Sequence, residues 1–136
     1  MWTGLYRRAT CMRPTVLFAD DDPLMHLLYK GHVERAGYCW ISATNGREAI
    51  EAAVREVPQL AVMDVVMPEM DGLSALLKLK QAETTKTIPV LVITSDPNYS
   101  LRQREFAGLG AAAFLNKPFS PAQLLEAIHR ILPSSA

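Results

Sequence analysis

The segment TVLFADDDP, residues 15–23, is the clearest indication of the fold. Five apolar residues end abruptly at three acids, and a short apolar run of this kind is typical of a strand buried on both faces. Asp22 suits the N-cap of a helix and Pro23 suits its first turn. We therefore predict a strand at 15–19 followed by a helix. The predicted buried side of that helix consists of Leu24, Leu27, Leu28 and Val33.

The same alternation recurs along the chain. Further apolar runs occupy Tyr38–Ala43, Leu60–Met63, Pro89–Ile93 and Ala112–Leu115. Amphipathic stretches that suit helices follow them, beginning at about Asn45–Gly46, Gly72, Tyr99 and Pro121. Five strand–helix repeats predict an α/β fold with a doubly wound parallel sheet, covered by helices on both faces. Ligands of such sheets bind beyond the carboxyl ends of the strands.

Length and composition limit the function classes. The chain has 136 residues, 14 basic and 14 acidic side chains and 49% hydrophobic residues, which suits one globular domain. The neutral balance argues against direct nucleic-acid binding, and no apolar run approaches the length of a membrane span. We expect an N-terminal extension at 1–13, a domain at 14–132 and a tail at 133–136. The two cysteines, Cys11 and Cys39, have no metal-like spacing, so we expect neither a disulfide framework nor a zinc site, and a cytoplasmic location.

Polar residues with a common chemistry follow four of the five runs. They are Asp20, Asp21, Asp64, Thr94 and Lys117. Converging carboxylates need a cation, and oxygen ligands of this type suit Mg²⁺. A lysine and a hydroxyl supply the charge and the hydrogen bond that a phosphoryl group requires, and a carboxylate can accept that group. Asp64 is the best-placed nucleophile. Each residue alone also has an ordinary structural explanation as a cap, a turn or a surface side chain.

Four motifs together resemble the response-regulator receiver domain of two-component signalling, including the chemotaxis-type regulators. They are ADDDP at 19–23, DVVMPEMDG at 64–72, ITS at 93–95 and LNKPF at 115–119. The resemblance extends from Pro14 to about Leu132. It implies a five-stranded (βα)5 flavodoxin-like fold with strand order 2-1-3-4-5.

For the metal site, the resemblance implies that Asp20 and Asp21 hold Mg²⁺. Asp64 would be the phosphoacceptor and would also contact the metal. The backbone carbonyl of Val66 would complete the protein ligands.

For the phosphoryl group, the resemblance implies that Thr94 and Lys117 each contact one of its oxygens. Phe114 falls at the switch aromatic of the family, and Lys117–Pro118 at its cis peptide bond. Phosphorylation would then alter the helix from about Tyr99, the fifth strand and the last helix. Because the apolar Val66 side chain does not orient water, and Asp96 would either orient or repel it, we expect slow dephosphorylation.

The resemblance implies a histidine kinase or a histidine phosphotransfer protein as phosphoryl donor. A downstream protein or a separate output domain would receive the signal, and two copies could pair as a homodimer. We expect a signalling switch with self-phosphorylation and autodephosphorylation rather than an enzyme.

Three alternatives remain open. The first is a protein-binding module of the same fold that works without phosphorylation. The second is a Mg²⁺-dependent phosphohydrolase, disfavoured because Val66 stands where a general acid is usual. The third is a flavin or nucleotide carrier, disfavoured because acids replace the glycine-rich loop.

Overall fold

A computed structural model of the chain describes residues 13–67, 69–95 and 99–132. The strands are β1 (Thr15–Ala19), β2 (Cys39–Ala43), β3 (Leu60–Asp64), β4 (Val90–Thr94) and β5 (Ala113–Asn116). The helices are α2 (Pro23–Arg35), α3 (Gly46–Glu56), α4 (Gly72–Gln81), α5 (Tyr99–Gly108) and α6 (Pro121–Ile131). None of these helices is long and apolar enough to cross a membrane.

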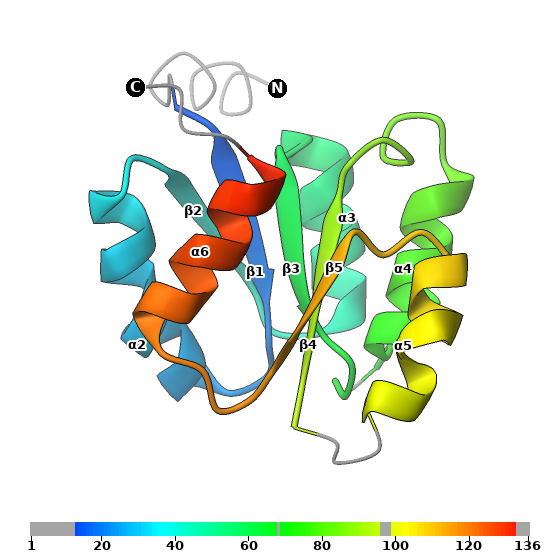
Figure 1. Cartoon of the computed structure of the whole chain (residues 1–136). Coiled ribbons are helices and arrows are strands. Elements are labelled where there is room, and N and C mark those ends of the chain that lie inside the picture. Colours follow the sequence, from blue (N-terminus) through cyan, green and yellow to red (C-terminus); the bar gives the residue numbers. More distant parts are fainter. Residues whose placement is uncertain (1–12, 68, 96–98, 133–136) are drawn as a thin grey trace.

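The five strands form one parallel sheet with the order β2-β1-β3-β4-β5. Helices α2 and α6 cover one face, and α3, α4 and α5 cover the other (Figure 1). Successive residues of a strand point to opposite faces, so Leu17 and Ala19 join one core cluster while Val16 and Phe18 join the other. The predicted α/β class and the implied strand order are both confirmed.

The predicted helix starts are also confirmed. The side chain of Asp22 accepts a hydrogen bond from the Leu24 amide at 3.0 Å, which caps α2. Asn45 and Asp71 cap α3 and α4 in the same way, and Ser120 forms a capping box at the start of α6. These caps fix where α2, α3, α4 and α6 begin, directly after the loop that follows a strand. They therefore shape the carboxyl edge of the sheet, where those loops lie.

The predicted buried side of α2 is wrong for three of its four residues. Leu24, Leu27 and Leu28 are 69%, 79% and 51% exposed. Val33 is buried as expected, and Tyr29 takes the remaining inward position. The Tyr29 ring stacks on Phe119 at 4.9 Å and its hydroxyl donates to the Phe119 carbonyl at 2.5 Å, so contact with the segment before α6 selects the inward face.

Cys39 begins β2, the edge strand of the sheet. Parallel pairing places Cys39 beside Thr15, and its amide donates to the Pro14 carbonyl at 2.8 Å. The start of β2 therefore lies next to the chain that enters β1, a proximity that the spacing of the cysteines does not reveal. Cys11 lies outside the described residues.

Candidate functional site

The three predicted carboxylates lie together at the carboxyl edge of the sheet. Asp20 follows β1 directly, Asp21 is the next residue, and Asp64 is the last residue of β3. Each offers an oxygen atom, and these oxygens all lie within 4.8 Å of one another. Asp20 is fully buried and Asp64 is 6% exposed, whereas Asp21 is exposed to solvent. Oxygen donors in this number and arrangement fit Mg²⁺, which takes few protein carboxylates and keeps several waters.

Lys117 provides the positive charge of the cluster. Its Nζ atom donates to Asp20 Oδ2 at 2.7 Å and to Asp64 Oδ2 at 3.1 Å. The Lys117 amide donates to the Thr94 carbonyl at 2.8 Å, which ties the loop after β5 to the end of β4. The Lys117–Pro118 peptide bond is cis, as the resemblance implied.

Burial dominates the electrostatics of the site. It raises the pKa of the Asp64 carboxyl above its ordinary value, the negative charge of Asp20 raises it further, and Lys117 offsets part of the effect. Burial alone would lower the pKa of Lys117, but its hydrogen bonds and ion pairs with Asp20 and Asp64 raise it above its ordinary value. Lys117 therefore stays positively charged beside Asp64, and a further cation would stabilise the ionised form of the Asp64 carboxyl.

A close backbone approach shapes the loop after Asp64. A Cβ atom on Gly72 would lie 2.3 Å from the Asp64 carbonyl oxygen, so only glycine allows α4 to begin so close to the end of β3. The Val66 amide donates to Asp64 Oδ1 at 3.4 Å, and the Val66 side chain is 71% exposed. This contact is made by the Val66 amide, whereas the residue's predicted role as a metal ligand belongs to its carbonyl oxygen.

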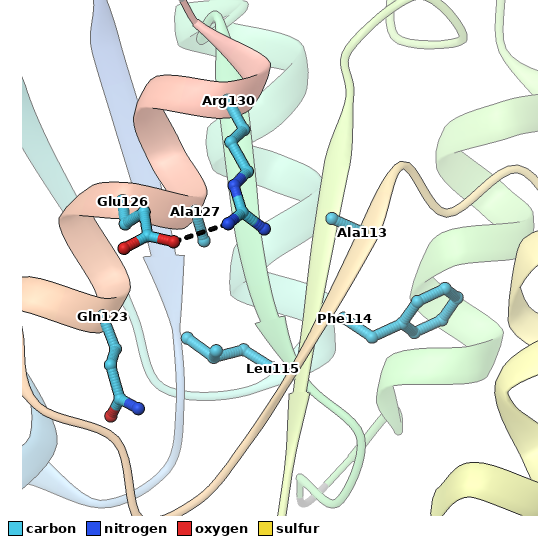
Figure 2. A pocket seen from close by; sticks show the side chains of 7 residues that line it. All are labelled: Ala113, Phe114, Leu115, Gln123, Glu126, Ala127 and Arg130. Carbon is cyan, nitrogen blue, oxygen red and sulfur yellow. Dashed lines mark hydrogen bonds and ion pairs between the residues drawn. The ribbon is translucent and has the colours of Figure 1, made fainter.

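The predicted hydroxyl and the predicted switch aromatic occupy the neighbouring strands. Thr94 is the buried last residue of β4 and lies at the same edge as the carboxylates. Phe114 is half-buried on β5, and its ring lies 6.4 Å from that of Phe106 in α5. In Figure 2 the Phe114 side chain points away from α6, while Leu115 points toward it. Asp96 lies outside the described residues.

Sequence reasoning missed one residue that contacts the site. His26, in the first turns of α2, places Nε2 at 2.7 Å from the Asp20 carbonyl oxygen. The available signal was its position four residues after the cap Asp22, one helical turn onward, which returns the side chain to the end of β1.

Known proteins resemble this chain in both sequence and fold. The sequence model described as the response regulator receiver domain matches residues 16–129. The chain is 32% identical to the chemotaxis protein CheY of Thermotoga maritima over 121 residues, 88% of this chain and 98% of that protein. It is 33% identical to the alkaline phosphatase synthesis transcriptional regulatory protein PhoP of Bacillus subtilis, over 91% of this chain and only 50% of PhoP.

Solved structures show the same relation. Chemotaxis response regulator CheY4 of Vibrio cholerae superposes with a TM-score of 0.82 at 30% identity, covering 88% of this chain and 99% of that one. The receiver domain of sensor histidine kinase PA1611 from Pseudomonas aeruginosa has the same fold, with a TM-score of 0.80 and 23% identity over 90% of this chain and 99% of that one. In that structure a magnesium ion is coordinated in the active-site cleft. The chain therefore belongs to the response regulator receiver domains, the signalling switches of two-component systems.

Proposed function

We propose that Asp64 of this chain accepts a phosphoryl group from a phosphohistidine and that the acyl phosphate switches a protein-interaction surface. The observation that carries the proposal is the cluster itself. Three carboxylates converge within 4.8 Å, and Lys117 contacts two of them. In the transfer, an Asp64 oxygen attacks phosphorus, the bond from phosphorus to the histidine nitrogen breaks, and its electron pair stays on the imidazole.

The proposed roles of the other residues follow from their places. Asp20, Asp21 and Asp64, with the Val66 carbonyl, would hold Mg²⁺, which when bound supplies positive charge against the phosphoryl oxygens. Lys117 would pair with one of those oxygens. Thr94 would donate to another from the end of β4.

The phosphoryl donor in this proposal is a histidine kinase or a histidine phosphotransfer protein. The exposed leucines of α2 support a protein donor, because they form an apolar surface on the helix that begins beside Asp20 and Asp21. Burying such side chains against a partner is favourable, whereas a small phosphodonor would leave them in water.

The proposed switch surface consists of α5, β5 and α6. Among the α5 side chains that are described, Phe106 alone is buried, and it contacts Phe114. A change in the position of Phe114 would therefore act on the buried side chain that packs α5 against the core. Next to it, a groove of about 270 Å³ runs between β5 and α6 (Figure 2). Its polar side chains are Gln123, Glu126 and Arg130.

The proposal extends to the whole chain. We place the receiver domain at 14–132, between the extension and the tail, in a cytoplasmic protein. It would act on a downstream protein, an output domain or a second copy of itself rather than on nucleic acid directly. Its acyl phosphate would hydrolyse slowly, because the apolar Val66 side chain, two residues after Asp64, cannot orient a water for attack.

Intact mass spectrometry tests the phosphoryl transfer. The protein is incubated with acetyl phosphate, with and without Mg²⁺, beside the variants Asp64→Asn and Asp71→Asn. Asp71 is a matched control, because it is an acid of the same loop that caps α4. We expect one added phosphoryl group that needs Mg²⁺, is lost in Asp64→Asn and persists in Asp71→Asn. No adduct under any condition, with a beryllofluoride mimic also failing to bind, would favour the phosphorylation-independent module.

A further inference from the structure

Three side chains link β2 to the carboxyl end of β1 through hydrogen bonds. Trp40 Nε1 donates to Ser42 Oγ at 2.7 Å. Ser42 Oγ lies 3.0 Å from His26 Nδ1, and His26 Nε2 lies 2.7 Å from the Asp20 carbonyl oxygen. This series of hydrogen bonds thus begins at the Trp40 indole on β2 and ends on the backbone of Asp20, a proposed metal ligand.

The chemistry of the groups sets the direction of every bond in this series. The Asp20 carbonyl only accepts, so His26 Nε2 carries the hydrogen and donates it. The indole only donates, so Ser42 Oγ accepts from Trp40; in a neutral ring with its hydrogen on Nε2, Nδ1 is an acceptor, and Ser42 Oγ donates its own hydrogen to it. This arrangement holds the ring in the Nε2–H tautomer, which is the one that the Asp20 carbonyl needs.

Aromatic neighbours hold the His26 ring in its orientation. The ring meets Phe18 edge-on, with centroids 5.2 Å apart and an interplanar angle of 80°. It meets Trp40 in the same manner, at 6.1 Å and 85°. Packing and hydrogen bonding therefore act on the same orientation of His26.

The bond to the Asp20 carbonyl acts on both Asp20 and Asp21. That oxygen belongs to the rigid, planar peptide unit that joins the two residues. Rotation of this unit changes ψ of Asp20 and φ of Asp21, and hence the relative directions of their carboxylates. The Asp20 amide is held by the Ala43 carbonyl at 3.0 Å, so the bond from His26 restrains the other end of the residue.

We infer that His26 is a positioning residue of the metal site, which holds the Asp20–Asp21 peptide unit in the orientation that brings both carboxylates to one cation. This inference rests on the proposed metal ligands. Its consequence is measurable without phosphorylation, because it concerns Mg²⁺ affinity.

The test is an NMR titration of ¹⁵N-labelled protein with MgCl₂, without phosphodonor. His26→Phe keeps the ring and its aromatic contacts but removes both nitrogens, and we expect its Mg²⁺ Kd to rise about tenfold, as for other groups that orient metal ligands. His26→Gln retains an N–H that reaches the carbonyl, and we expect a Kd within about threefold of the parent. His32→Phe, at an exposed position of the same helix, should leave the Kd unchanged.

The indole signal of Trp40 supplies a second readout, measured in a Trp2→Phe background that leaves one tryptophan. We expect this signal to move with Mg²⁺ in the parent and to stay still in His26→Phe and in Ser42→Ala. If His26→Phe does not fold, the comparison of Ser42→Ala with His26→Gln tests whether His26 positions the metal ligands.

Equal Mg²⁺ Kd values for the parent and His26→Phe would overturn the inference and leave the proposed function intact. No Mg²⁺ binding by the parent would instead overturn the proposed metal ligands, and with them the inference. The two failures are therefore distinguishable.

Discussion

Replacing Lys117 with methionine removes a cation that contacts both buried carboxylates. Lys117 Nζ lies 2.7 Å from Asp20 and 3.1 Å from Asp64, while those two carboxylates are almost fully buried. In the metal-free Lys117→Met protein the two negative charges face each other without compensation. The folded state must then either bear their repulsion or take up a proton.

The cost of proton uptake limits the loss of stability. Removing one partner of a buried ion pair costs about 3–5 kcal/mol. Protonating Asp64 from its ordinary pKa of 3.8 costs about 1.36 kcal/mol per pH unit above that value, which is about 5 kcal/mol at pH 7.5 and about 2 kcal/mol at pH 5.5. We therefore expect a loss of about 3–5 kcal/mol at pH 7.5 that shrinks to about 2 kcal/mol or less at pH 5.5.

Urea unfolding in the presence of a chelator measures this loss at the two pH values. Lys78→Met, at an exposed position of α4, is the matched control and should change stability by less than about 0.5 kcal/mol. A Lys117→Met protein that unfolds at the same urea concentration as the parent would refute the reasoning. So would a large loss that is the same at both pH values.

Three further predictions concern the acceptor and its loop. Because the folded state raises the pKa of Asp64, ionisation of this carboxyl destabilises the fold as the pH rises through and above 3.8. Metal-free Asp64→Asn should therefore be roughly 1 kcal/mol more stable than the parent at pH 7 and should lose this advantage below pH 4. Denaturant melts that show no advantage at pH 7 would count against the raised pKa. Val66→Asn should shorten the lifetime of the acyl phosphate several-fold by holding a water, as measured by loss of the adduct mass over time; an unchanged lifetime would remove Val66 as its determinant. Gly72→Ala should lower the stability of the fold by at least about 2 kcal/mol, because its methyl group would meet the Asp64 carbonyl. Gly108→Ala is the control and should lower it far less, because a methyl group there meets open space. Similar thermal midpoints for the two variants would contradict this account of the loop.

The sequence predicted the site better than it predicted the packing. Asp20, Asp64, Thr94 and Lys117 could be placed together because each stands at the end of a parallel strand, and such ends share one edge of the sheet. The sequence could not predict which face of α2 points inward, because apolar residues occur on all sides of that helix. The contact that selects the face, between Tyr29 and Phe119, involves a distant segment of the chain.

The contacts that orient the site were also beyond the sequence. The bond from His26 to the Asp20 carbonyl depends on a ring that packs edge-on against Phe18 and Trp40, and Trp40 belongs to a strand that pairs with β1 only in the folded sheet. Periodicity reports which residues share a face of one element. It does not report which element lies opposite.

The identity of the phosphorylated residue is the central claim, and chemical mapping tests it most directly. The phosphorylated protein is reduced with borohydride, which converts an aspartyl phosphate to homoserine, and is then digested and sequenced by tandem mass spectrometry. The account predicts homoserine at position 64 alone, and only when Mg²⁺ was present during phosphorylation. Homoserine at Asp20, Asp21 or Asp71 in place of Asp64 would contradict it.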